Sequence, residues 1–201
     1  MIRRTKIRLA VAAMAVALSS SAVAQAKFGA NSDALLTAVR EQNGAKTAAI
    51  VQQKGTSVIN VRGYGGDTPL TVAMANRSST YVSFLLILGA EPDFTNQRGE
   101  TALLIAARSG FGEGVEIMLT TGANVGLANR QGETPLIVAV QGRRTRIVRM
   151  LLEAGATADT PDFAAGFSAR DYARRDTRNP ELLRLIETIK PIKKAVAGPT
   201  R

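Results

Sequence analysis

Apolar residues recur along this chain in blocks that repeat at a fixed interval. The clearest block spans residues 132–140, and copies in the same register lie at 99–107 and 66–74. Every copy starts with glycine, has a threonine two residues later, and then carries leucine and alanine three residues apart. A fixed period of this length, about 33 residues, is typical of a repeat array in which each unit is one supersecondary structure. The chain is therefore predicted to stack similar units side by side.

A second apolar pattern follows each block. In the clearest unit it consists of Val148, Leu151 and Leu152, and apolar residues occupy the same positions one and two periods upstream. Spacings of three and four residues place such side chains on one face of a helix. Gly155 then stands where a helix commonly ends in the left-handed conformation. Each unit is thus predicted to end with a helix that is buried along one side.

The block itself has the features of a helix start. Thr68 and Thr134 are typical N-cap residues, and Pro69 and Pro135 follow at the first helical position, where proline loses no hydrogen bond. The alanine of each block, such as Ala139, allows neighbouring helices to approach closely. Each unit is therefore predicted to be a pair of helices joined by a turn.

The first and last units depart from this pattern. Residues 33–62 carry a weaker copy, whose second helix is predicted near 48–51 and ends at Gly55. Residues 166–189 form the last copy, in which Ile189 replaces the terminal glycine, so we expect this helix to continue past Ile189. Terminal repeats of an array are atypical because one of their faces must meet water.

The N-terminal segment differs from the repeats in composition. Residues 1–24 combine a basic start, an apolar run and small residues, which predicts a signal peptide cleaved after Ala24, with Ala26 as a second choice. The apolar run is shorter than the roughly 20 residues that a membrane span needs. No cysteine follows it to carry a lipid anchor. The mature protein is thus expected in the periplasm or outside the cell, without a stable membrane anchor.

The net charge of +10 belongs mainly to the two ends of the chain. Residues 1–24 and 190–201 each contain four basic residues and no acid, and the latter are predicted to form a disordered basic tail. The nearly neutral repeats lack the basic stripe of a nucleic-acid-binding protein. The chain has no cysteine and no histidine, which excludes disulfides, zinc sites built from these ligands and histidine-based catalysis. We therefore expect no enzyme activity, no metal and no cofactor.

Three short segments offer groups that some ligand sites use. The glycine-rich segments 110–114 and 63–66 lack the lysine and the strand context of a phosphate-binding loop, and they are predicted to be turns. Asp159, Thr160 and Asp162 offer oxygen atoms for calcium, but their spacing is not that of an EF-hand. A polar loop is the simpler prediction for this last segment.

Three features together resemble ankyrin repeats: the motif Gly-x-Thr-Pro-Leu-x-x-Ala, a second helix that ends in Leu-Leu-x-x-Gly-Ala, and the fixed period of the blocks. The resemblance covers residues 33–189 and implies an all-α solenoid of about five helix–turn–helix repeats with projecting β-turn fingers. The repeats are expected at about 33–62, 66–98, 99–131, 132–164 and 166–189.

Two positions depart from the family pattern. The histidine that usually follows the leucine is replaced by Thr71, Leu104 and Ile137, so hydrogen bonding there cannot follow the family. Gly126 replaces the usual asparagine of a finger. These departures leave the helical frame as predicted.

In ankyrin repeat proteins, partners usually lie against the finger tips and the exposed ends of the first helices. By this resemblance, the expected contact surface is a polar row of mixed charge with one aromatic side chain. Its residues are Tyr64, Asp67, Asn76, Gln97, Arg98, Glu100, Arg108, Ser109, Arg130, Gln131, Glu133 and Gln141. Such a surface favours a hydrogen-bonded protein partner over nucleic acid or a membrane.

These observations predict an exported, non-enzymatic monomer that binds another protein reversibly and stoichiometrically. A sharper version is a protein that masks or assists an envelope enzyme. The alternative is a structural envelope scaffold, in which the arginine cluster at residues 143–149 and the basic tail bind an anionic surface. Arg146 and Arg149 lie three residues apart on the solvent side of their helix, opposite the apolar stripe. A solvated convex face explains the same cluster without any ligand.

Overall fold

The computed structural model describes residues 32–63 and 65–189. Within these residues the regular structure is helical, apart from one isolated bridge between Pro161 and Ser168. The predicted signal peptide, Tyr64 and the predicted basic tail lie outside the described residues. The first unit contains a helical segment at 32–40, helix α2 (Gly44–Lys54) and the 3-10 helix η1 (Thr56–Asn60).

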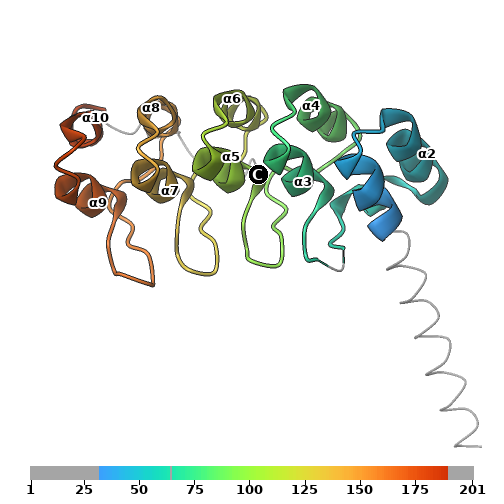
Figure 1. Ribbon diagram of the computed structural model, residues 1–201, viewed down its shortest axis with the longest axis horizontal. Helices are drawn as coiled ribbons and strands as arrows, with labels where there is room; N and C mark the ends of the chain where they lie inside the picture. The colour runs from blue at the N-terminus through green and yellow to red at the C-terminus, as the bar shows by residue number, and fades with distance from the viewer. Residues whose placement is uncertain (1–31, 64, 190–201) are drawn as a thin grey trace, which may run out of the picture.

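The units that follow each contain a first and a second helix. In chain order the pairs are α3 (Pro69–Ala75) with α4 (Ser79–Ile87), α5 (Ala102–Ser109) with α6 (Gly112–Thr120), α7 (Pro135–Gln141) with α8 (Thr145–Glu153), and α9 (Ala169–Arg175) with α10 (Pro180–Thr188). The first helices lie side by side in one row and the second helices in another (Figure 1). The all-α solenoid predicted from the sequence is confirmed.

The two sides of this solenoid differ in shape. The loops between the units project as fingers from the row of first helices, whereas the row of second helices forms the outer, convex side (Figure 1). The first helices and the fingers therefore line the opposite, concave side. Among the described residues, no helix is both long and apolar enough to cross a lipid bilayer.

The first helices are short and depend on their caps. The side-chain oxygens of Thr68, Thr101 and Thr134 each accept a hydrogen bond from the backbone amide three residues later, at 3.1–3.2 Å. Helix α7 has only seven residues, and a helix of that length is not stable alone in water. Caps therefore fix where these helices begin, and packing against neighbouring repeats keeps them folded.

The core follows the predicted period. Val82, Val115 and Val148 are fully buried, as are the side chains three residues after each of them. The third position of the stripe is less uniform, because Leu152 is buried whereas its equivalents upstream are only half-buried. Gly114 shows how close the repeats approach, since a Cβ atom there would lie 2.5 Å from the sulfur of Met74.

Two helix boundaries differ from the prediction. Helix α2 begins at Gly44 and so precedes the predicted segment 48–51, because the side chain of Asn43 caps it by accepting from the amide of Lys46 at 3.0 Å. Helix α10 ends at Thr188, and Ile189 is extended, so this helix does not continue past Ile189. Pro191 explains the ending, because proline has no amide hydrogen to donate and disfavours helical conformation in the residue before it.

The positions that lack the family histidine are satisfied in two ways. The Thr71 hydroxyl accepts from the Thr68 amide at 2.8 Å and completes a reciprocal capping box. Leu104 and Ile137 are fully buried in the apolar core. Hydrogen bonding at this position is therefore local in one repeat and replaced by apolar packing in the next two.

Candidate functional site

The last three fingers are each held in shape by one buried polar side chain, whereas the first finger has Gly63 at the equivalent position. The amide of Asn96 donates to the carbonyl of Glu100 at 3.0 Å, and Asn129 and Glu133 repeat this contact at 3.0 Å. The side-chain oxygen of Asn96 also accepts from the amides of Arg98 and Glu100, both at 2.9 Å. Asn129 makes the equivalent pair of contacts in the next finger. These contacts satisfy the buried side-chain amides of Asn96 and Asn129 in place of water, and they hold the backbone of the two fingers in a turn.

These asparagines were not among the contact residues predicted from the sequence. The repeat period could have revealed them, because Asn96, Asn129 and Asp162 occupy the same position in successive repeats. Asp162 takes the same role in the last finger, where its Oδ1 accepts from two backbone amides at 2.8 and 3.1 Å. A polar residue that recurs in register with the core is thus a candidate for loop structure before it is one for binding.

Neighbouring fingers are joined by backbone hydrogen bonds, which requires close approach. The contacts run from the Gln97 amide to the Gly66 carbonyl (2.7 Å), from Arg130 to Arg98 (3.1 Å) and from Phe163 to Gln131 (2.8 Å). Gly132 has a positive φ of 79°, and a Cβ atom on it would lie 2.8 Å from the Phe163 nitrogen. Glycine is therefore needed there both for its conformation and for the approach of the next finger.

Glu100 is the centre of a charged network on the concave side. Its side chain was expected on the exposed row, but the residue is only 2% exposed. Its Oε2 accepts from Asn96 Nδ2 and Arg98 Nε, both at 2.8 Å, and its Oε1 accepts from Arg108. These donors replace the water that a buried carboxylate loses. The expectation that Glu100 is free to contact a partner is therefore corrected.

The protonation of Glu100 follows from the same contacts. Burial by itself raises the pKa of this carboxyl, but the hydrogen bonds from Asn96, Arg108 and Arg98 and the positive charge of Arg108 outweigh burial. The pKa consequently lies below its ordinary value of 4.5. The network is thus built around a carboxylate that stays ionised at neutral pH.

Arg108 links this finger to the next one. From helix α5 it donates through Nη1 to Glu100 and through Nη2 to Glu133 Oε2 at 2.9 Å. Asn129 Nδ2 donates to the same oxygen of Glu133 at 2.7 Å. The side chain of Glu133 is 21% exposed, against 3% for Glu100. Three residues of the predicted contact row are therefore bound to one another.

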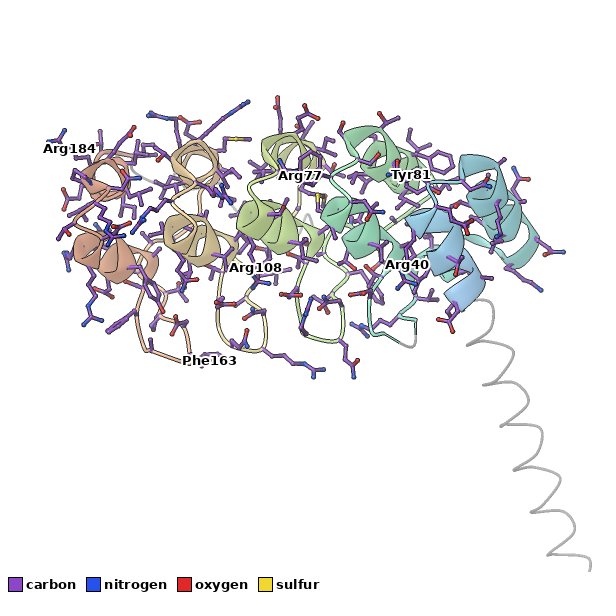
Figure 2. The ribbon with its side chains drawn as sticks, in the orientation of Figure 1. Arg40, Arg77, Tyr81, Arg108, Phe163 and Arg184 are labelled. Atoms are coloured by element: carbon purple, nitrogen blue, oxygen red, sulfur yellow. The ribbon has the colours of Figure 1, made fainter. Side chains whose placement is uncertain are left out.

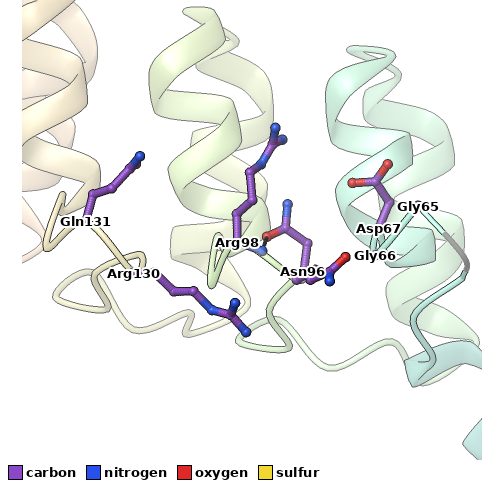
Figure 3. Close-up of a pocket in the computed structure, with 8 residues that line it drawn as sticks. Gly65, Gly66, Asp67, Asn96, Arg98, Arg130 and Gln131 are labelled. Atoms are coloured by element: carbon purple, nitrogen blue, oxygen red, sulfur yellow. Dashed lines mark hydrogen bonds between the residues drawn. The ribbon is translucent and has the colours of Figure 1, made fainter.

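An open groove of about 460 Å³ crosses the tips of three fingers. It is lined by Gly65, Gly66, Asp67, Asn96, Gln97, Arg98, Arg130 and Gln131. Arg130 extends along this groove toward the finger that holds Asn96 (Figure 3). Within the part of the chain that the structure describes, no carboxylate forms an ion pair with Arg130. Its guanidinium is therefore available to a ligand, unlike those of Arg98 and Arg108.

A second groove, of about 560 Å³, continues from the first along the concave side. Both grooves include Asp67 and Arg98, and the second one reaches Arg40 and Asn76. Its floor is partly apolar, with Val72 among the lining side chains. Figure 2 shows Arg40 and Arg108 on the side of the first helices, facing the fingers. The two grooves together form a continuous surface built by several repeats, which we call the concave groove.

The other predicted contact residues have these positions. Asn76 is exposed at the end of α3, and Gln97 and Gln131 are exposed on the fingers. Ser109 is half-buried, and its carbonyl accepts from Arg77 Nη1 at 3.0 Å. Gln141 is exposed at the end of α7. Apart from Tyr64, which is not described, and Glu100, which is buried, the predicted residues have solvent-accessible surface on the concave side.

The acidic residues of the last finger are engaged within the protein. Asp159 accepts from Arg170 at 2.6 and 3.2 Å, and Asp162 accepts from the hydroxyl of Tyr172 at 2.6 Å. The hydrogen bond from Tyr172 holds the pKa of Asp162 below its ordinary value, and the same bond raises the pKa of Tyr172. Residues 32–63 and 65–189 contain no cluster of three or more acidic side chains suited to a metal ion.

The arginine cluster at 143–149 divides into two parts. Arg143 donates to both carboxylate oxygens of Asp176 at 2.6 and 3.0 Å, and this bidentate contact holds the pKa of Asp176 below its ordinary value. Arg146 and Arg149 are exposed on the outer side of α8, as predicted. Arg149 lies 4.0 Å from Glu181, at the limit of an ion pair. The cluster is therefore not one uniform basic patch.

Comparison with known proteins identifies the repeats. Residues 80–162 match the family model for ankyrin repeats, in three copies. No curated protein matches the chain. The matched segment is similar to ankyrin repeats, and the paired, stacked helices of the described residues are consistent with an ankyrin solenoid. Ankyrin repeats generally mediate protein–protein interaction and are typically non-enzymatic binding modules.

Proposed function

We propose that this protein binds one partner protein in the concave groove, noncovalently and stoichiometrically. The observation that carries the proposal is the continuity of the groove, which runs across the finger tips and along α3 and α5. Its polar rim and partly apolar floor resemble the composition of protein interfaces. The mixed surface offers hydrogen bonds at Gln97 and Gln131, an unpaired cation at Arg130 and apolar contact at Val72.

The contacts within the groove indicate which side chains select the partner. Glu100 and Glu133 are balanced by Arg98 and Arg108 together, so they contribute little free negative charge. Arg130 and Arg40 have no carboxylate partner within the described residues, and against the one carboxylate of Asp67 in both grooves they leave a small positive surplus. The partner surface is therefore expected to be acidic or rich in hydrogen-bond acceptors.

The proposal also assigns the protein a cellular location and a role. Residues 1–24 have the composition of a signal peptide, so we place the mature protein in the periplasm or outside the cell. A stoichiometric binder in that location can mask or assist an envelope enzyme. The repeats supply the rigid frame for such a role, and the groove residues supply the specificity.

The experiment compares capture of the partner by two variants. Arg130→Glu reverses the unpaired charge in the groove without touching the Glu100 network. Arg184→Glu is the matched control, because Arg184 is exposed on α10, away from the fingers (Figure 2). Tagged protein is expressed in its host and complexes are isolated from an envelope extract. Loss of capture with Arg130→Glu alone supports the proposal, and equal capture by both variants contradicts it.

The alternative of an envelope scaffold is weaker in this structure. Arg143 is paired with Asp176 and Arg149 approaches Glu181, so the cluster presents fewer free charges than its sequence suggests. Sedimentation of the protein with vesicles of anionic lipid tests this alternative. Binding that disappears when residues 190–201 are removed, and that weakens with salt, would favour the scaffold.

A further inference from the structure

Opposite charges occupy equivalent positions on the outer face of α6 and α8. Glu113 and Arg146 hold the same position in successive repeats, and so do Glu116 and Arg149. All four side chains are exposed. In the described part of the chain, Glu113, Glu116 and Arg146 make no ion pair, and Arg149 has only the 4.0 Å contact with Glu181. The repeat frame thus presents two matched pairs of opposite charges, in which Arg149 is the one member with an ion-pair contact within the described residues.

These charges lie on two adjacent helices of the outer row. In chain order that row consists of α2, α4, α6, α8 and α10 (Figure 1). Within it, α6 presents Glu113 and Glu116 to solvent and the neighbouring α8 presents Arg146 and Arg149.

We propose that this outer side is the contact surface for a second copy of the same chain. The two copies would be related by a two-fold axis that runs parallel to the helices and lies on the outer side, midway between α6 and α8. This rotation reverses the order of the repeats but preserves position along the helices. Glu113 then faces Arg146 of the second copy, and Glu116 faces Arg149 of the second copy.

The symmetry makes the contact self-complementary. Every ion pair occurs twice, because each copy supplies both the acidic helix and the basic helix, and the assembly closes as a dimer. Like charges would meet if α6 faced α6, so the charges also exclude that register. A lipid surface or a nucleic acid would use only the arginines, whereas a second copy uses both signs in one register.

An apolar groove beside these charged side chains supports the same occupant. The groove has a volume of about 490 Å³ and lies between α4 and α6; Leu86, Ile87 and Ile117 line it together with Glu113 and Glu116. Ile87 is 84% exposed. The two-fold axis places α8 of the second copy against the side of this groove formed by Glu113 and Glu116, so dimerisation would cover that side of it. The concave groove stays free, so the dimer does not depend on the proposed protein-binding function.

This inference departs from the monomer expected from the sequence. Exposed ion pairs are individually weak and are screened by salt. The dimer is therefore expected to be reversible, to form at high protein concentration and to weaken as salt rises. A pairing of this kind presents two concave grooves on opposite sides of one particle.

Charge exchange tests the register directly. The protein purified from cells that express the full chain is studied by sedimentation equilibrium at low salt. Glu113→Arg with Glu116→Arg makes both facing helices basic, and Arg146→Glu with Arg149→Glu makes both acidic. Each double variant should raise the dimer Kd by more than about tenfold, because like charges then meet across the axis. An equimolar mixture of the two double variants, and the variant that carries all four changes, should both recover the dimer.

The controls separate this outcome from a folding defect or a general charge effect. Glu41→Arg with Glu91→Arg gives the same change in net charge at exposed sites away from α6 and α8, and should leave the dimer intact. Circular dichroism should show unchanged helix content in every variant. A wild-type protein that stays monomeric at low salt overturns the proposal. Assemblies larger than dimers would also overturn it, and so would an equimolar mixture of the two double variants that stays monomeric.

Discussion

The third and fourth repeats share one frame but differ on both of their surfaces. Helices α5 and α7 have the same threonine cap and the same buried leucine and alanine. On the concave side, Glu100 is buried in a network whereas Glu133 remains partly exposed. On the outer side, the equivalent positions of α6 and α8 carry opposite charges. Periodic positions therefore specify the architecture, and the aperiodic ones distinguish the surfaces of the two repeats.

The two glutamates show that an equivalent position need not have an equivalent role. Glu100 accepts from three side chains, including Asn96, which cannot turn to water because it is buried. Glu133 accepts from Arg108 and Asn129 and keeps contact with solvent. A buried polar group that loses its partner is more costly than an exposed one. We therefore expect the same substitution to lower the free energy of unfolding more at Glu100 than at Glu133.

The largest expected effect comes from Glu100→Gln. The substitution removes the charge and places an amide donor among side chains that are themselves donors. We expect the free energy of unfolding to fall by about 2 kcal/mol, because a buried amide donor at this position faces the donors of Asn96 and the arginines without an acceptor. Glu133→Gln should lower it by less than about 1 kcal/mol, since the site is accessible to water. Urea denaturation followed by circular dichroism measures both, and equal losses would contradict the distinction between the two fingers.

A comparable effect is expected where one finger packs on another. Gly132→Ala adds a Cβ that would lie 2.8 Å from the Phe163 backbone, in a residue with φ of 79°. Gly166→Ala meets no atom within 4 Å, at φ of 67°. We expect losses of about 2 kcal/mol for the first and about 1 kcal/mol for the second, because only the first adds a clash to the conformational strain. Thermal unfolding compares them, and a larger loss at Gly166 would be inconsistent with finger-to-finger packing.

The pH dependence of the free energy of unfolding should reflect the protonation of Glu100. The folded-state pKa of Glu100 is lowered from its ordinary value of 4.5, so the unfolded chain takes up a proton first as pH falls. The stabilisation from this group is therefore complete above pH 4.5 and is lost as pH drops through the folded pKa. Urea midpoints measured from pH 7 to 3 should fall less steeply for Glu100→Gln than for the wild type. Parallel curves would show that Glu100 does not contribute.

The smallest expected effect concerns the turn between the helices of a pair. Gly110 has φ of 71°, and Arg143 occupies the equivalent position in the next repeat with φ of 52°. Gly110→Ala should destabilise the fold by about 1 kcal/mol, because a side chain is strained in this conformation. Arg143→Gly relieves that strain but loses the bidentate contact with Asp176. Its thermal midpoint should stay near the wild-type value, and a clear rise would mean that the contact with Asp176 contributes nothing.

The sequence was sufficient to predict the frame because the frame is periodic. Threonine caps, leucine and alanine of the first helix and the stripe of the second helix recur once in each of the three central repeats. Each feature has a local cause that does not depend on distant residues. The helix boundaries were less predictable at the ends of the array, where Asn43 and Pro191 act alone and no repeat confirms them.

The candidate site was predictable in location but not in detail. Glu100 and Glu133 have the same place in the motif, and the local difference is Arg98 two residues before Glu100 where Gln131 precedes Glu133. Their difference depends on Arg98 and Arg108, which bring two guanidinium groups to Glu100. Such convergence is a tertiary property, since a side chain in α5 must meet two separate fingers. The repeat period locates the candidate site positions in the sequence. Tertiary contacts between side chains determine which of these positions are free to contact a partner.

The most direct test of the central claim is crosslinking in living cells from two positions. A photoreactive amino acid at Gln131 would report on the concave groove, and one at Thr80, which is exposed on α4, would report on the outer side. The account predicts one specific adduct with a partner protein from position 131 and none with that partner from position 80. An adduct with that partner from position 80 and none from position 131 would contradict the assignment of the concave groove as the binding surface.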